Sequence, residues 1–362
     1  MRTGTAELPL HSGRAPRWLF VRMAQLAAAV AELILLEEGT EGFLARVSDP
    51  HWFQALGCTL GFDWHSSGLT TTTCGAIKEG LRGRELELGL YAAGGKGNAS
   101  RRTPDEIRTW CEQTGADDRP LVFASRMSAK VDSAAVQDGY QIYHHVFFFD
   151  RYGSWSVVQQ GMNEETSMAR RYHWLSRAVD DFVCEPHAAI CCDRRAPTLN
   201  LVARDSTATR SIVTDLAREK PIRVVQEAVR FRHLALPSRH DIRPTDIAPD
   251  RLAAILTKTY EAQAVGFQEL LMLPGVGAKS LRALALVAEL VYGATPSYDD
   301  PARFGFAHGG KDGIPYPVDR ATYDRTIDLL SRAVRRAKLG ETEEVRALRR
   351  LDAAFGSQRK GA

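Results

Sequence analysis

Residues 273–280 constrain the fold of this chain more than any other segment. Their sequence, LPGVGAKS, places one proline and two glycines between two stretches of helical periodicity, 251–272 and 281–292. Glycine at 275 and 277 lets the backbone take a positive φ or approach a ligand closely, because a Cβ is absent. The second helix then begins with unpaired N–H groups at the positive end of its dipole. We therefore predict two helices joined by a tight hairpin that suits a phosphate group.

This segment resembles the hairpin of the helix-hairpin-helix family, which holds DNA by its backbone without reading bases. The resemblance covers about residues 251–293. It implies DNA contacts from the hairpin and from the first turn of the second helix, at Gly275, Val276, Gly277, Lys279 and Ser280. The alternative interpretation is an ordinary helical turn, in which the proline and the glycines only mark the break between two helices.

The net charge of the whole chain, +3, does not indicate a nucleic-acid partner, but the distribution of charge does. Basic residues outnumber acidic ones in 194–240 and again in 332–360, on both sides of the hairpin helices. A surface that follows a phosphate backbone requires such basic stretches. A solvated helix face would have the same composition, so this alternative stays open.

A chain of 362 residues can bury a large core, and two or three domains are expected. We predict an α+β protein. Residues 1–193 would form a mixed α/β domain that contains a β-hairpin sheet and the catalytic residues. Residues 194–362, where the composition becomes basic and helical, would form an all-helical DNA-binding domain.

The sequence favours a soluble, cytoplasmic protein. Its most apolar run, 24–36, is interrupted by Glu32 and is too short to span a bilayer. The six cysteines form no CxxC pair and are too sparse for a disulfide scaffold. Four residues offer soft ligands for zinc at a spacing that matches no standard site, and buried reduced thiols are the alternative. They are Cys184, His187, Cys191 and Cys192.

Aromatic and β-branched residues predict a β-hairpin with strands 140–150 and 155–160 and a turn at 151–154. A four-residue turn places His145 opposite Gln160 and Val146 opposite Gln159. Polar side chains would then gather at the end of the hairpin away from the turn.

The carboxylates and the histidine around this hairpin predict a metal site. Asp138, His145 and Asp150 would bind Mg²⁺ or Mn²⁺ and activate water for phosphodiester cleavage. Arg170 and Arg171 would hold the DNA strand. A polar-ended hairpin with satisfied hydrogen bonds is the alternative interpretation. The candidate catalytic residues are Lys130, which would stabilise phosphoryl charge, and Asp132, Asp138, His145, Asp150 and Gln160.

Seven short motifs resemble a bacterial and archaeal domain-of-unknown-function family, number 763. They are ASR at 124–126, KVD at 130–132, QDGY at 137–140, HH at 144–145, VQQGM at 158–162, RRYHW at 170–174 and FAHGGKDGIPYP at 306–317. The resemblance runs over nearly the whole length. It implies an architecture and assigns no reaction.

Three hypotheses about function follow. The favoured one is a DNA-processing or repair enzyme, a metal-dependent nuclease that grips the DNA backbone with the hairpin. In the second, the helical part resembles DNA glycosylases of the endonuclease III type, whose lysine forms a Schiff base with the sugar. Lys279 and Asp319 would fill the two catalytic positions, although the gap between them is wider than that family's usual one; Asp299 fits that gap better but lies in a less helix-like context. In the third, the protein is a DNA-binding adaptor without catalysis.

Overall fold

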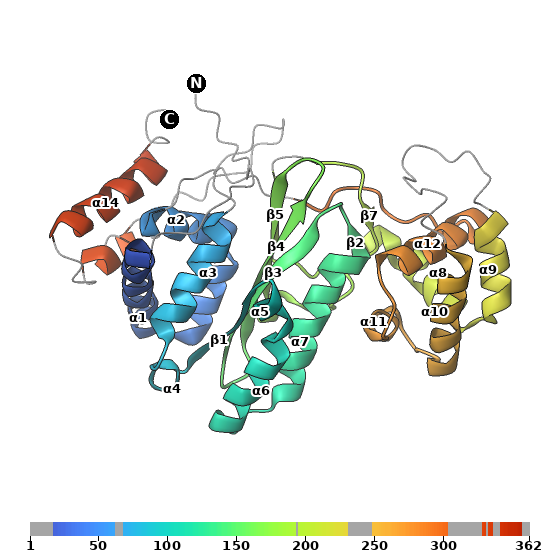
Figure 1. Cartoon of the computed structure of the whole chain (residues 1–362), viewed down its shortest axis with the longest axis horizontal. Helices are drawn as coiled ribbons and strands as arrows, with labels where there is room; N and C mark the ends of the chain where they lie inside the picture. The colour runs from blue at the N-terminus through green and yellow to red at the C-terminus, as the bar shows by residue number, and fades with distance from the viewer. Residues whose placement is uncertain are drawn as a thin grey trace.

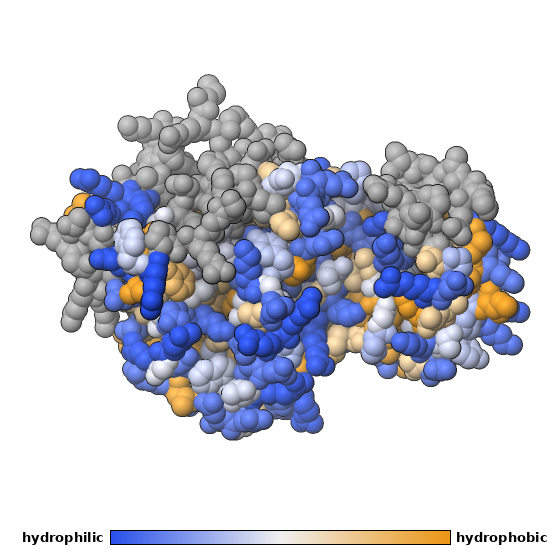
Figure 2. Space-filling model, in the orientation of Figure 1, coloured by the Kyte–Doolittle hydropathy of each residue, from blue (hydrophilic) through white to orange (hydrophobic). Residues whose placement is uncertain are grey.

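A computed structural model describes residues 17–61, 68–192, 195–230, 248–302, 328–330, 332–335 and 341–356. An antiparallel sheet lies at the centre, with helices on both faces and a further group of helices, α8–α12, to one side (Figure 1). This combination of helices and antiparallel strands confirms the predicted α+β class. Figure 2 shows hydrophilic residues over much of the visible surface, with apolar residues prominent over the α8–α12 side.

The helices and strands occur in the following order along the chain. The first part contains α1 (Arg17–Ser48), α2 (Pro50–Leu60), α3 (Gly68–Leu81), α4 (Glu85–Leu88), β1 (Leu90–Lys96), α5 (Asn98–Arg101), α6 (Thr103–Thr114) and α7 (Asp118–Lys130). The middle contains the π-helix η1 (Val131–Ala135), β2 (Val136–Gln137), β3 (Gln141–Asp150), β4 (Trp155–Asn163), β5 (Met168–Leu175), the 3₁₀ helix η2 (Ser176–Ala178), β6 (Ala189–Cys191) and β7 (Leu199–Asn200). The last part contains the 3₁₀ helix η3 (Arg204–Ser206), α8 (Thr207–Arg218), α9 (Pro221–Arg230), α10 (Pro249–Ala262), α11 (Phe267–Met272), α12 (Ala278–Tyr292) and α14 (Glu341–Gly356).

Aspartates mark the starts of two helices that cover the sheet. The Asp49 carboxylate accepts hydrogen bonds from the N–H groups of His51 and Trp52 at the start of α2. Asp117 accepts one from the N–H of Arg119 at the start of α7. These bonds satisfy donors that have no partner inside the helix, so the sequence positions both helix starts locally.

The main sheet has five strands in the order β1-β3-β4-β5-β6, and all neighbours are antiparallel. Both faces are covered, which explains why β4 and β5 are buried along nearly their whole length. One face presents Phe147 and Trp174 to the core shared with α6 and α7. The other face presents Phe148 and Val158 to the core shared with α1, α2 and α3.

The β3–β4 hairpin is confirmed, but its predicted register is wrong by one residue. His145 lies opposite Gln159, and Val146 lies opposite Val158. The turn is one residue shorter than predicted, because the N–H of Asp150 donates to the carbonyl of Ser154 and Gly153 takes a φ of 93°. A left-handed residue at this position is typical of three-residue hairpin turns.

Helix α1 is long and apolar enough to cross a membrane by length and composition alone. In the structure, however, Leu26, Val30 and Ile34 are buried in a core cluster with Phe53 of α2 and Leu69 of α3. Such packing is that of a core helix in a globular fold.

The chain does not divide into the two units predicted on either side of residue 194. The later part returns to the earlier part twice, because β7 pairs with β2 and α14 packs against α2. The buried residues of α8–α12 also form one continuous core with the sheet face beneath α6 and α7. The segment 194–362 is therefore neither all-helical nor separate, since its buried surfaces are completed by elements from the first half.

The Asp150→Ala substitution should lower the free energy of unfolding by about 3 kcal/mol. The buried carboxylate accepts hydrogen bonds from the N–H groups of Tyr152 and Ser154 and from the Thr40 hydroxyl, so it fixes the turn and ties it to α1. Denaturant unfolding followed by fluorescence measures the change. Asp180→Ala, at an exposed aspartate, should cost less than about 0.5 kcal/mol. Equal stability of the two variants would contradict this role of Asp150.

Candidate nucleic-acid interface and the adjoining polar networks

The turn between α11 and α12 has the geometry of a tight hairpin with an exposed tip. Gly275 is exposed and has a φ of 92°, a conformation that suits glycine. Val276 is buried and anchors the turn in the core beside Leu281. The Ser280 hydroxyl accepts a hydrogen bond from the Gly277 N–H at the start of α12. The first N–H groups of α12 therefore lie beside the exposed turn.

Side chains from the α/β part hold the hairpin in place. The Lys130 ammonium donates a hydrogen bond of 2.6 Å to the carbonyl of Val276. The Gln137 amide donates one of 2.8 Å to the carbonyl of Ala278, and Arg282 of α12 donates back to Gln137. Half-burial lowers the pKa of Lys130. Lys130 was predicted to stabilise phosphoryl charge. In the structure its side chain instead holds a backbone carbonyl of the hairpin.

The π-helix η1 connects α7 to β2 and carries a fully buried carboxylate, Asp132. π-Helical turns are rare and are frequent at functional sites. Asp132 Oδ2 accepts hydrogen bonds from the Gln159 amide and, at 2.9 Å, from Trp174 Nε1. Asp132 Oδ1 is paired with His187 Nε2. Three donors from different strands and loops therefore converge on one carboxylate.

The Asp132 network continues across the sheet to α7. His145 Nδ1 lies 3.0 Å from the Gln159 side-chain oxygen. His145 Nε2 lies 3.0 Å from the Ser125 hydroxyl. Burial lowers the pKa of His145, so the imidazole is neutral in this chain of hydrogen bonds.

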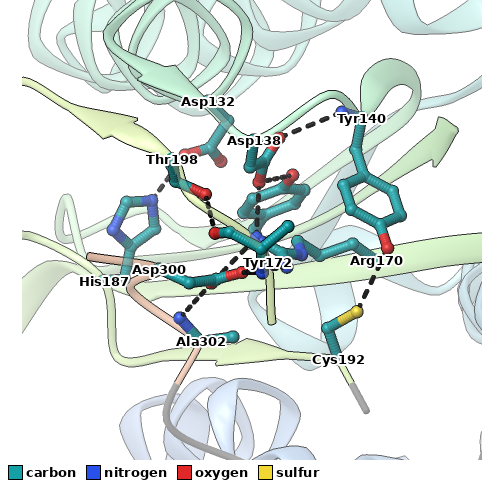
Figure 3. Close-up of polar contacts among 11 residues, drawn as sticks. Asp132, Asp138, Tyr140, Arg170, Tyr172, His187, Cys192, Thr198, Asp300 and Ala302 are labelled. Carbon is teal, nitrogen blue, oxygen red and sulfur yellow. Dashed lines mark hydrogen bonds and ion pairs between the residues drawn. The ribbon is translucent and has the colours of Figure 1, made fainter. Parts of the chain in front are cut away.

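A second network surrounds Arg170 and lies next to the first (Figure 3). The guanidinium is 1% exposed and forms ion pairs of 2.9 Å with Asp138 and 2.7 Å with Asp300. The Tyr172 hydroxyl donates to Asp138 at 2.7 Å, and the Tyr140 ring lies beneath the guanidinium. Burial raises the pKa of Asp138, while the charge of Arg170 opposes that rise. A buried pair of this kind loses much of its hydration, which the several hydrogen bonds offset.

Arg171 is buried on the opposite face of the sheet, because neighbouring residues of β5 alternate between faces. Its guanidinium donates to His173 Nε2 at 2.9 Å and to the Gln54 side chain at 3.0 Å. Neither Arg170 nor Arg171 reaches the surface, and this corrects the prediction that they hold a DNA strand.

A row of polar residues crosses this second face in register. The residues directly opposite one another are Lys96, His144, Gln160, Arg171 and Cys191, one from each strand. His144 is 1% exposed, and neither of its ring nitrogens has a hydrogen-bond partner in the described part of the chain. Burial, followed by the neighbouring His145 and the charge of Lys96, lowers its pKa to about 3. The imidazole is therefore neutral at physiological pH.

The three predicted metal ligands are not brought together. Asp150 and His145 face opposite sides of the sheet, and Asp138 is held by Arg170 and Tyr172. Within the described ranges, no group of three or more His, Cys, Asp or Glu side chains is arranged to hold a metal ion. This corrects the proposed common ligand set, whose members were near in sequence but alternate between faces.

The predicted soft-ligand cluster is also dispersed. His187 points to Asp132, and burial raises the pKa of the Cys191 thiol to about 12. Cys192 lies 3.3 Å from the Tyr140 hydroxyl. The cysteines are free thiols, which favours the interpretation as buried reduced residues.

Several members of these networks were not predicted from sequence to act together, and His187 was predicted only as a zinc ligand. The Asp132 network depends on Ser125, Gln159, Trp174 and His187, and the Arg170 network on Asp300. The correct hairpin register would have paired Gln159 with His145. His187 and Asp300 carry no such signal, because they reach the networks from distant loops.

These features define an α+β protein with two buried polar networks and a helical turn, exposed at Gly275, that Lys130 and Gln137 hold in place. The chain belongs to the family described as Protein of unknown function (DUF763), whose model matches residues 4–318. No curated protein and no solved structure matches the chain significantly.

The free energy of unfolding should fall as the pH is lowered from 7.5 to 5, and His144 should account for about 2 kcal/mol of that loss. The unfolded chain takes up a proton at this histidine below about pH 6.5. The folded chain does not until about pH 3, so acid favours the unfolded state. Denaturant unfolding at both pH values measures the effect.

His144→Phe is the matched variant, because it keeps a ring and removes both nitrogens. It should leave the stability at pH 7.5 equal or higher, since no hydrogen bond is lost within the described residues. It should also reduce the pH dependence by about 2 kcal/mol. An identical pH dependence in both proteins would show that His144 is not the buried neutral group.

Proposed function

We propose that this protein binds the backbone of nucleic acid, DNA first of all, through the hairpin between α11 and α12. The observation that carries the proposal is the exposed turn at Gly275 beside the start of α12, which is fixed to the α/β part by Lys130 and Gln137. A fixed turn loses little conformational entropy when a ligand binds. Pre-oriented N–H groups at a helix start suit a phosphate oxygen.

The chemistry around the turn supports a phosphate as the ligand. Lys279 is exposed in the first turn of α12 and adds a positive charge to that of the helix dipole. Gly277 has an extended backbone, and a Cβ added there would meet no atom within 4 Å. The space in front of this residue is therefore open to a ligand. Backbone contacts of this kind carry no base information, so we expect little sequence specificity.

The three hypotheses from sequence share this binding mode and differ in catalysis. For the glycosylase hypothesis, Lys279 is exposed as a nucleophile must be, and Asp319 lies outside the described residues. Borohydride trapping on abasic DNA tests this hypothesis, because only a Schiff base gives a stable covalent complex. The nuclease hypothesis is tested by degradation of undamaged DNA with and without Mg²⁺ or Mn²⁺. Binding without either activity favours the adaptor, and for all three we propose a cytoplasmic location.

Gly277→Val should weaken DNA binding at low ionic strength by about tenfold or more. The loss of one charge-assisted hydrogen bond costs roughly 1.5–3 kcal/mol, and 1.4 kcal/mol corresponds to a factor of ten in Kd. The branched side chain fits the protein but occupies the open space in front of the turn. Fluorescence anisotropy with labelled single- and double-stranded oligonucleotides gives the Kd values, and melting temperatures report folding.

Charge variants separate hairpin binding from general attraction. Lys279→Ala should reduce the slope of log K against log salt by about 0.9, the value for one phosphate contact on duplex DNA. Lys258→Ala removes an equally exposed lysine from α10 and should leave that slope nearly unchanged. Undiminished binding by Gly277→Val, or no DNA binding by the wild type at low salt, would overturn the proposal.

A further inference from the structure

We propose that Asp132 and His187 form a general-base dyad that hydrolyses a phosphodiester bond of the strand held by the hairpin. This inference rests on the proposed nucleic-acid binding and gives it a reaction. It assigns His187 as the catalytic residue and Asp132 as the residue that positions it.

The geometry of the pair is that of an oriented imidazole. His187 Nε2 faces the Asp132 carboxylate, and its N–H donates a hydrogen bond to Oδ1. Its Nδ1 is then the basic nitrogen, and within the described residues it takes part in no hydrogen bond. The Trp174 ring, 4.5 Å away, and the Tyr172 ring, 6.2 Å away, restrict the orientation of the imidazole.

Access to solvent distinguishes His187 from the other members of the Asp132 network. The His187 side chain is 7% exposed to solvent, whereas the Asp132 side chain is fully buried. Ser125 and His145, at the far end of the network, are also buried. A proton taken up at His187 can therefore leave to solvent, and the buried carboxylate stabilises the imidazolium while it exists.

The loop that carries His187 has an unusual backbone. Glu185 has a φ of 48° although it precedes a proline, a conformation that costs energy and that clusters at functional sites. Its N–H donates to the carbonyl of Val202, which holds the loop in this form. The exposed Arg204 lies 3.7 Å from the Glu185 carboxylate and forms an ion pair with it.

The dyad is physically connected to the hairpin. Asp132 follows two residues after Lys130, so their Cα atoms lie within about 7.6 Å of each other. Lys130 holds the carbonyl of Val276, and α12 packs against η1. The π-helical segment that carries Asp132 thus lies against the second helix of the hairpin.

The proposed step is a hydrolysis in which all atoms are accounted for. His187 Nδ1 takes a proton from water as the water oxygen forms a bond to phosphorus. The bond between phosphorus and one ester oxygen breaks, and that oxygen takes a proton from solvent. The imidazolium returns its proton to solvent. The products are a phosphate monoester and a hydroxyl end, and water is the only co-reactant.

The test measures binding and cleavage separately on the full chain. His187→Gly should bind labelled DNA with an unchanged Kd. Its cleavage rate should fall by at least about 100-fold, the lower end of the range for loss of a general base. Free imidazole should restore part of the cleavage by His187→Gly, which a purely structural role would not allow. Asp132→Asn should lower kcat and leave KM nearly unchanged, because its effect passes through His187. His51→Ala, at a half-buried histidine of α2, is the control and should cleave as the wild type does.

The outcomes separate this inference from the proposed function. If the wild type binds DNA but does not cleave it, with or without divalent ions, the dyad is not catalytic and hairpin binding stands. Cleavage by His187→Gly at the wild-type rate, or a loss that imidazole does not relieve while the fold is intact, overturns the dyad as well. If the wild type does not bind DNA at low salt, the proposed function fails and the inference fails with it.

Discussion

The buried carboxylate of Asp132 is the interaction on which the rest of the architecture depends. An isolated charge in a protein interior costs several kcal/mol, so Asp132 is tolerable only with its donors in place. Gln159 and Trp174 reach it from neighbouring strands, and His187 from a loop. Its π-helical segment also packs against α12, the second helix of the hairpin. Asp132 and its π-helical segment therefore join the sheet, the loop that carries His187 and the second helix of the hairpin.

The sheet separates two polar interiors that serve different purposes. The motif RRYHW at 170–174 sends alternate side chains to opposite faces, so Arg170 and Arg171 belong to different networks. On one face, Asp138 and Asp300 balance a buried guanidinium, and the ion pair joins β5 to the loop after α12. On the other face, the buried His144 imidazole lies in register with Lys96 and Gln160, and its pKa is lowered to about 3.

Local patterns predicted the elements well, and their failures have definite causes. The aromatic β-hairpin and the helix that follows the turn correspond to observed elements. The helix predicted over 251–272 is instead divided into α10 and α11, because Gln263 takes a left-handed conformation. The register failed because the hydrogen bond between Asp150 and Ser154 shortens the turn by one residue. The metal-ligand set failed because strand alternation separates His145 from Asp150. The all-helical C-terminal unit failed because β7 and α14 complete surfaces formed early in the chain.

By itself, the sequence determined the α+β class, the turn at Gly275 and the strands whose residues fit a covered sheet, because these follow from backbone conformation and short-range periodicity. Tertiary structure alone decided which polar residues meet. Asp132 and His187 are 55 residues apart, and Arg170 and Asp300 are 130 apart. Spacing along the chain cannot encode such pairs, because they form only when burial removes water and forces each charge to find its partner.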